Sequence, residues 1–183
     1  MRRLRQRIPE FGGMKRGERV LDVCCGTGDQ ATYLAGLGMD AYGIDLDPKM
    51  IAIAERKRKK YGKENLHFQL ADATALPFED AFFDSSTISL ALHEKPFETQ
   101  KKVISEMRRV TKNGGMIILA DYPVPAGRLY RFAEMLVGGE HYACFKASQS
   151  LGGMDSLSES FKLQVVKKGR AINGGLELLE IKN

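Results

Sequence analysis

Near the N-terminus, two acidic residues flank a turn of small residues. Asp22 follows an apolar segment, Gly26 and Gly28 come next, and Asp45 stands seventeen positions after Gly28. Small residues at the end of a strand let a ligand approach the backbone, and the helix that follows offers unpaired N–H groups to a carboxylate. Asp22 would face an ammonium group, and Asp45 would accept hydrogen bonds from ribose hydroxyls. The spacing indicates a ligand that carries an ammonium group at one end and a ribose at the other.

The same turn also fits the pattern of a dinucleotide site. Residues 26–31 read Gly-Thr-Gly-Asp-Gln-Ala, and an acid follows downstream. Asp22 argues against that interpretation, because a carboxylate just before the turn would repel a pyrophosphate but attract an ammonium group. A chain of 183 residues is also short for a nucleotide domain plus a substrate domain. The residues therefore favour S-adenosylmethionine over NAD.

The elements that must position these residues alternate between strand and helix patterns, which is typical of a parallel sheet covered on both faces. The predicted strands are residues 19–24, 41–45, 66–70, 83–90 and 116–121, and the predicted helices are residues 29–37, 48–61 and 97–111. A short helix is expected at residues 128–137. Paired glycines at 138–139 and 152–153 bracket a segment expected to be irregular. Residues 161–168 and 176–181 are strand-like, and the glycines between them favour an antiparallel hairpin.

Composition and charge indicate a single globular domain. Hydrophobic residues make up 43% of the chain and charged residues 28%, with a net charge of +5. Residues 1–18 form a basic N-terminal arm, and the second basic run, residues 56–60, falls at the end of a predicted helix, where cations complement the helix dipole. We interpret that run as a solvated face, so nucleic acid is not the expected partner. Strand-sized apolar runs, the absence of a signal-peptide core and three unpatterned cysteines predict a cytoplasmic protein without a membrane span.

The chain resembles the class I S-adenosylmethionine-dependent methyltransferases, and within them the group that includes the ubiquinone and menaquinone biosynthesis methyltransferases. The loop motif of that family, D-x-G-x-G-x-G, reads Asp-Val-Cys-Cys-Gly-Thr-Gly at residues 22–28, with Cys24 in place of the first glycine. The resemblance covers residues 19–183. It implies an α/β, Rossmann-like, doubly wound sheet of seven mostly parallel strands with the last antiparallel, in a three-layer α/β/α arrangement.

The resemblance also implies the cofactor and its contacts. S-adenosylmethionine would be bound and S-adenosylhomocysteine released. Leu46 would pack on the adenine, and Asp72 would accept from its exocyclic amine, although Asp72 alone is equally compatible with a turn cap. The expected cofactor-binding residues are Asp22, Cys24, Gly26, Thr27, Gly28, Asp45, Leu46, Asp72, Ala73 and Ser89.

His93 and Tyr122 are the candidate catalytic residues. His93 follows the fourth predicted strand and Tyr122 the fifth, where this family places residues that face the substrate. Either would bind the acceptor or take its proton, as methylation of a phenol or an activated aromatic carbon requires. His141 is expected to pack within a substrate-covering segment at about residues 122–156. No metal is expected, because the sulfonium methyl is already activated and no dense His, Cys or carboxylate cluster is evident.

The acceptor is expected to be a small, lipophilic, possibly quinone-like molecule. An amino-methylating nucleic-acid enzyme would carry an N/D-P-P-Y/F-like motif after the fourth strand, where residues 89–92 read Ser-Leu-Ala-Leu. An RNA or protein methyltransferase, and a non-catalytic module that retains the cofactor fold, stay open as alternatives. The expected assembly is a monomer or a homodimer.

Overall fold

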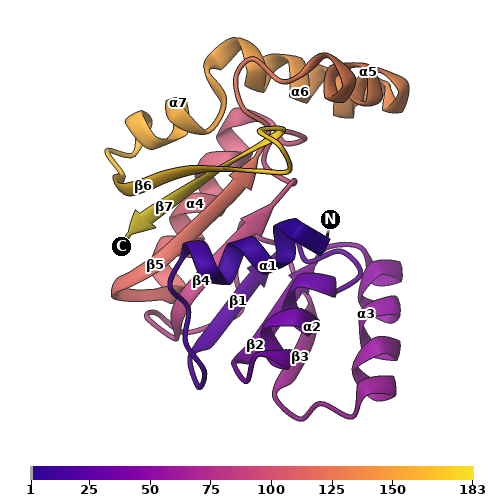
Figure 1. The fold of residues 1–183 in the computed structure, drawn as a ribbon, viewed down its shortest axis with the longest axis vertical. Coiled ribbons are helices and arrows are strands. Elements are labelled where there is room, and N and C mark those ends of the chain that lie inside the picture. The colour runs from indigo at the N-terminus through magenta and orange to yellow at the C-terminus, as the bar shows by residue number, and fades with distance from the viewer. Residues whose placement is uncertain (1) are drawn as a thin grey trace.

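A seven-stranded sheet organises the chain, and the computed structural model describes residues 2–183 of it (Figure 1). The strands are β1 (Arg19–Val23), β2 (Asp40–Asp45), β3 (Leu66–Leu70), β4 (Phe83–Ser89), β5 (Thr111–Asp121), β6 (Gln164–Ala171) and β7 (Leu176–Lys182). Their order is β3-β2-β1-β4-β5-β7-β6. Neighbours among β1–β5 pair in parallel, whereas β7 is antiparallel to both β5 and β6. The predicted mostly parallel sheet with a terminal hairpin is confirmed.

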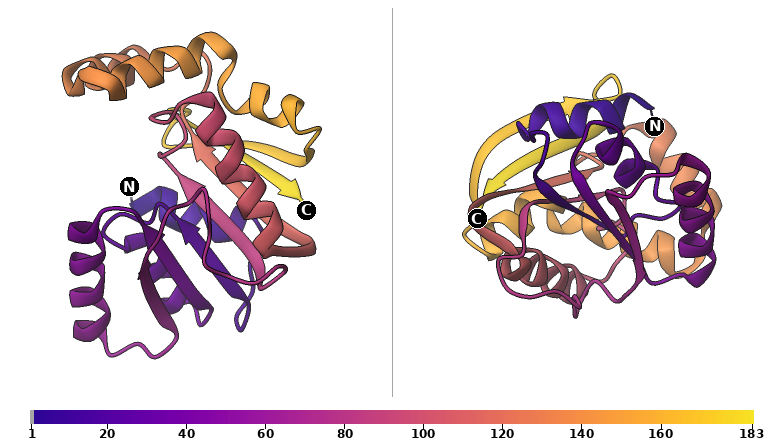
Figure 2. Two further views of the ribbon diagram at one scale, coloured as in Figure 1. Left: turned by 180° about the vertical axis from the view of Figure 1, so that it is seen from behind. Right: turned by 90° about the horizontal axis from the view of Figure 1, so that it is seen from below.

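Helices cover both faces of this sheet (Figures 1 and 2). They are α1 (Arg2–Phe11), α2 (Asp29–Gly36), α3 (Pro48–Tyr61), α4 (Phe97–Val110), α5 (Arg128–Val137), α6 (Gly139–Leu151) and α7 (Gly153–Ser160). Alternation along β5 defines the layers. Ile118 and Ala120 share a buried cluster with α1, whereas Ile117 and Leu119 pack in the main core with α4 and α7. The three-layer α/β/α prediction is therefore confirmed.

Two helices and several boundaries differ from the sequence-based expectations, and the strand expected at residues 161–168 is β6, Gln164–Ala171. Residues 139–151, expected to be irregular, form α6, and α7 follows directly. The helix predicted to reach residue 111 ends at Val110, and β5 begins at Thr111 instead of Met116, with a shift in its pairing to β4. No helix within residues 2–183 combines the length and apolar character needed to cross a membrane.

The basic segment at the N-terminus is a helix packed on the sheet. Leu4, Ile8 and Phe11 of α1 are at most 3% exposed and lie against residues of β5 and β7. Its arginines project away from this apolar stripe, as the 3.6-residue period of a helix requires. This packing brings the start of α1 to the carboxyl end of β1, where the acid–glycine turn lies.

Candidate active site

Asp45 holds the turn that follows β1. The backbone N–H of Gly26 donates to Asp45 Oδ2 at 2.8 Å, and the N–H of Asp47 donates to Oδ1 at 2.9 Å. The N–H of Cys25 donates to the carbonyl of Ile44 at 2.8 Å. One carboxylate thus fixes the loop after β1 and the start of α3 together. Each oxygen keeps a free lone pair, which a ribose hydroxyl can use.

Asp22 is buried in the centre of the sheet. It lies on β1 between Gly43 of β2 and Thr87 of β4, and it is 1% exposed. Its Oδ2 has no hydrogen-bond partner among residues 2–183. Burial raises the pKa of the carboxyl to about 7, an effect that the backbone N–H of Ala31 reduces and Asp45 increases. Because a buried, unpaired carboxylate is costly, this oxygen fits the cationic group of a ligand.

A cavity opens beside Asp22 at the carboxyl end of β1. Its lining includes Cys24, Gly26, Thr27 and Ser89 of the predicted set. Leu4 and Arg5 of α1 also line it, which sequence reasoning did not predict. Arg5 is held there by an ion pair to Asp29 at 2.6 Å. Residues from α1 therefore help to close this cavity, and its size and polarity suit an amino-acid group.

A second, larger cavity lies on the other side of Cys24, whose side chain lines both. Its volume is about 540 Å³, within the usual range for a small-molecule site. The predicted residues Asp45, Leu46, Asp72 and Ala73 all line it. Asp72 also accepts a hydrogen bond from the N–H of Thr74 at 2.8 Å. Its carboxylate therefore caps this turn and at the same time lines the cavity. Gly28 lines neither cavity; it is the N-cap of α2.

His93 and Asp121 form a buried pair beyond this cavity. His93 Nδ1 lies 2.6 Å from Asp121 Oδ1, and the side chains are 6% and 4% exposed. Asp121 also accepts from the backbone N–H groups of Leu92, His93 and Tyr122. Burial lowers the pKa of His93, but the hydrogen bond and charge of Asp121, together with Glu134, outweigh burial and raise the pKa overall.

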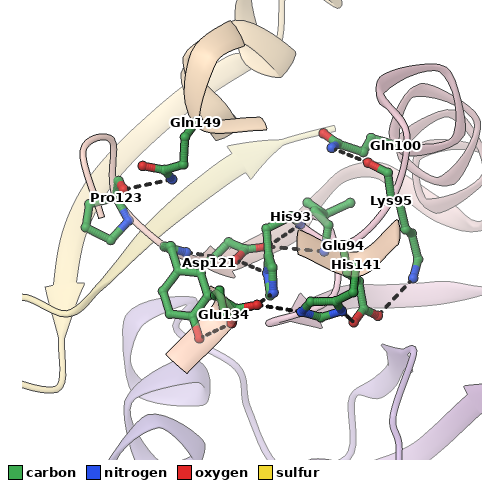
Figure 3. Close-up of polar contacts among 11 residues, drawn as sticks. His93, Glu94, Lys95, Gln100, Asp121, Pro123, Glu134, His141 and Gln149 are labelled. Atoms are coloured by element: carbon green, nitrogen blue, oxygen red, sulfur yellow. Dashed lines mark hydrogen bonds and ion pairs between the residues drawn. The ribbon is translucent and has the colours of Figure 1, made fainter. Parts of the chain in front are cut away.

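Glu134 and His141 extend this pair into a network (Figure 3). The hydroxyl of Tyr122 donates to Glu134 Oε1 at 2.9 Å, and His141 Nε2 bonds Glu134 Oε2. His141 Nδ1 lies 3.3 Å from Glu94 Oε2, and Glu94 lines the second cavity. Burial, followed by the contact with Glu134, raises the pKa of Tyr122. The network therefore connects α5 and α6 to the rim of the cavity.

The two candidate catalytic residues lie inside this network and line neither cavity. Glu94 is the member that reaches the cavity, and sequence reasoning missed it. The expectation that the chain has no dense His and carboxylate cluster is wrong, because ligand atoms of His93, Glu94 and His141 lie within 4.8 Å of one another. Their positions on a loop and on α6 hid this proximity from any motif search.

The strand order, the antiparallel β7 and the acid–glycine turn define a class I S-adenosylmethionine-dependent methyltransferase domain. Residues 20–115 match the family described as "Methyltransferase domain". The chain belongs to this family.

Sequence relatives and solved structures agree with that assignment. A demethylmenaquinone methyltransferase of Renibacterium salmoninarum is 33% identical over 163 residues, covering 88% of this chain and 66% of the relative. One of Geobacillus kaustophilus is 35% identical over 167 residues, covering 81% and 70%. The chain thus spans about two thirds of the length of these relatives.

Two solved structures share the fold. A SAM-dependent methyltransferase from Aquifex aeolicus has a TM-score of 0.72 at 19% identity, covering 97% of this chain and 88% of its own. A protein from Pyrococcus horikoshii has a TM-score of 0.77 at 20% identity, covering 99% and 88%. At these identities the likeness concerns the fold alone.

Proposed function

We propose that this chain transfers a methyl group from S-adenosylmethionine to a small, lipophilic acceptor of the quinol type and releases S-adenosylhomocysteine. The observation that carries the proposal is the buried Asp22 carboxylate, whose Oδ2 lacks a partner beside a cavity at the end of β1. The ammonium group of the donor would supply that partner. The quinol-type acceptor is supported by relatives named demethylmenaquinone methyltransferase.

The donor would occupy both cavities, with its amino-acid group beside Asp22 and its nucleoside in the larger cavity. Asp45 would accept from the ribose hydroxyls, Leu46 and Ala73 would flank the adenine, and Asp72 would accept from its amine. The turn formed by Cys24, Gly26 and Thr27 would pass between the two ends of the donor. Gly28 would not contact the donor; it would hold the turn in position from the side that faces Phe68. In-line displacement then needs alignment of the two ligands and exclusion of water.

The acceptor would approach between Ser89 and the covering segment. Leu129, Phe132 and Leu136 of α5, at helical spacing, are 75%, 54% and 70% exposed. These side chains line neither cavity, and they give the covering segment an exposed apolar surface that suits a lipophilic molecule. We infer that His93 and Tyr122 act on the acceptor indirectly, through Glu134 and His141 to Glu94, the member of the network that lines the larger cavity.

We infer the same domain organisation that the sequence predicts. Residues 19–183 would form the methyltransferase domain, with residues 1–18 as an N-terminal arm and about 122–156 as the acceptor cover. Cys24, Cys25 and Cys144 are free thiols in the structure, which supports a reducing compartment such as the cytoplasm. The working assembly would be a monomer or a homodimer.

Asp45→Asn is expected to weaken S-adenosylmethionine binding by roughly ten- to a hundredfold, as expected for loss of one charged hydrogen-bond acceptor. The amide would keep one acceptor oxygen for the loop but lose the second. Titration calorimetry of the two proteins measures the change. Asp40→Asn is the matched control, because Asp40 lies at the other end of β2 and pairs with His67 and Arg19. Equal affinity in the Asp45 variant and the wild type would contradict the assignment.

Methyl transfer itself is tested with S-adenosylmethionine labelled in its methyl group and a demethylated naphthoquinol that carries a short prenyl tail. Label in the extracted quinol, absent with the Asp45 variant, supports the proposal. Donor binding without labelled quinol, but with labelled RNA or protein from an extract, would point to the rival substrate classes. Binding without any labelled product would identify a non-catalytic module.

A further inference from the structure

Five titratable side chains from four parts of the chain meet behind the larger cavity (Figure 3). His93 and Glu94 follow β4, Asp121 ends β5, Glu134 belongs to α5 and His141 to α6. One ligand atom each of His93, Glu94 and His141 lies within 4.8 Å of the other two. In Figure 3 the His141 imidazole lies between the two carboxylates, with Nδ1 toward Glu94 and Nε2 toward Glu134.

Asp121 prepares His93 to act as a ligand. Its carboxylate accepts three backbone N–H groups, which fixes its position and its negative charge. It also bonds His93 Nδ1 at 2.6 Å, so the proton of a neutral imidazole belongs on Nδ1. The lone pair then lies on Nε2, which faces Glu134 Oε1 at 3.7 Å, beyond hydrogen-bond distance. A carboxylate that orients a histidine in this way is the usual outer shell of a metal site.

The carboxylates around the cluster provide the negative charge that a bound cation would need. Asp121 and Glu134 are buried and Glu94 is half-buried, which gives three negative charges. Among the side chains that contact them, Lys95 is the one with a permanent positive charge, at 3.3 Å from Glu94. Coordination to a metal requires both imidazoles to be neutral, and the contacting groups then sum to two negative charges. A divalent cation matches that sum.

We propose that His93, Glu94 and His141 bind a divalent transition-metal ion, with His141 using Nδ1 while Glu134 holds its Nε2. Two imidazole nitrogens with a carboxylate oxygen suit Zn²⁺, Co²⁺, Fe²⁺ or Mn²⁺, whereas Mg²⁺ and Ca²⁺ prefer oxygen alone. Ligand atoms about 2.0–2.2 Å from an ion must approach one another more closely than 4.8 Å. The side chains of Glu94 and His141 are 36% and 28% exposed, so we expect them to make the small shift that coordination requires.

The ion would join the covering helices to the sheet. His141 would be tied through it to the loop after β4, and Glu134 of α5 holds the other nitrogen of His141, so that α5 and α6 close over the edge of the larger cavity. Glu94 lines the larger cavity, which the donor would occupy, and an open coordination position at the edge of that cavity would receive an oxygen atom of the acceptor. This last role rests on the proposed function, whereas metal binding does not.

Metal binding is tested on the full chain after dialysis against a chelator. We expect one equivalent of Co²⁺ to bind with micromolar or lower Kd, with the visible absorption of a nitrogen- and oxygen-ligated ion and no thiolate charge-transfer band. The missing band separates this site from Cys24 and Cys25. Mn²⁺ or Zn²⁺ should compete for the same site and raise the unfolding temperature. Protection of the α5–α6 connection from protease should increase as well.

Variants decide whether the named side chains are the ligands. His141→Ala and Glu94→Gln should each weaken Co²⁺ binding at least tenfold and change its absorption spectrum. His67→Ala is the control, because His67 pairs with Asp40 on another part of the sheet and should leave Co²⁺ binding unchanged. Circular dichroism establishes that each variant is folded. If the wild type bound Co²⁺ no more tightly than His141→Ala, the proposal would be overturned. The five side chains would then be a network of ion pairs and hydrogen bonds without a metal.

Failure of this inference is distinguishable from failure of the proposed function. S-adenosylmethionine titrated in the presence of chelator reports on Asp22 and Asp45 alone. Donor binding without Co²⁺ binding would overturn the metal site and leave the methyltransferase proposal standing. Co²⁺ binding without donor binding would overturn the methyltransferase proposal and leave the metal site standing.

Discussion

Asp22→Asn is expected to weaken S-adenosylmethionine binding by roughly a hundredfold and, at pH 8, to raise the stability of the ligand-free protein. The loss of affinity follows from removing a buried charge opposite an ammonium group, a charge-assisted contact of about 2–3 kcal/mol. The gain in stability follows because the unpartnered Oδ2 of Asp22 is held ionised in the apolar centre of the sheet. Titration calorimetry and thermal unfolding measure the two effects on the same samples.

The stability gain should depend on pH in a defined direction. The pKa of Asp22 is raised from 3.8 to about 7 in the folded protein. Between those values the folded state binds more protons than the unfolded state, so this group costs stability progressively as the pH rises. The cost is complete above pH 7. Unfolding temperatures of Asp22→Asn and wild type should therefore lie close together near pH 4 and diverge by several degrees at pH 8.

Asp84→Asn provides a control of opposite sign. Asp84 accepts from the backbone N–H of Arg19 and from Lys112 Nζ, and these bonds outweigh burial and lower its pKa. Its ionised form therefore stabilises the fold above the unfolded pKa, and the amide variant should lose stability at pH 8. If Asp22→Asn also lost stability at pH 8, or kept full donor affinity, Asp22 would not be the unpaired carboxylate that the site requires.

The repeating core elements were predictable because their residues follow simple periods. β1 to β5 carry buried aliphatic residues, and α4 repeats Val103, Met107 and Val110 at helical spacing. α6 was missed for a physical reason. Phe145 and Ser148 are its only buried residues, so no apolar stripe marks it. The glycines read as breakers cap it instead; Gly152, left-handed at φ 98°, ends the helix.

The arrangement of Asp22, Gly26 and Asp45 around the turn after β1 was predictable from the sequence, whereas the network around His93 and Tyr122 was predicted only in those two residues. Asp22, Gly26 and Asp45 lie on adjacent strands and one turn, so sequence spacing alone brings them together. His93, Glu134 and His141 come from a loop and two helices, and their contacts depend on how α5 and α6 fold back over β5. Spacing along the chain carries no signal for such a meeting.

Gly28→Ala is expected to destabilise the fold by about 2–4 kcal/mol, the range expected for overpacking combined with backbone strain. Gly28 has φ 74°, and a Cβ added there would lie 2.4 Å from Phe68 Cζ and 2.8 Å from Ala54 Cβ. Relief of those contacts must move the start of α2, because the N–H of Gly28 bonds the carbonyl of Cys25 and its own carbonyl bonds Thr32. Donor affinity should fall with stability, since the turn moves too.

Alanine variants of two further glycines serve as controls that distinguish backbone strain from steric overlap and from loss of donor binding. Gly62, which ends α3, and Gly26, in the turn, both have positive φ and no atom within 4 Å of an added Cβ. Alanine at either position should cost about 1 kcal/mol of backbone strain in chemical unfolding. Gly62→Ala should keep full donor affinity, whereas Gly26→Ala should lose it, because its Cβ enters the cavity beside Asp22. If Gly28→Ala lost no more unfolding free energy than Gly62→Ala, the Phe68 side chain would be free to move away from the added Cβ. The turn would then tolerate a side chain at position 28.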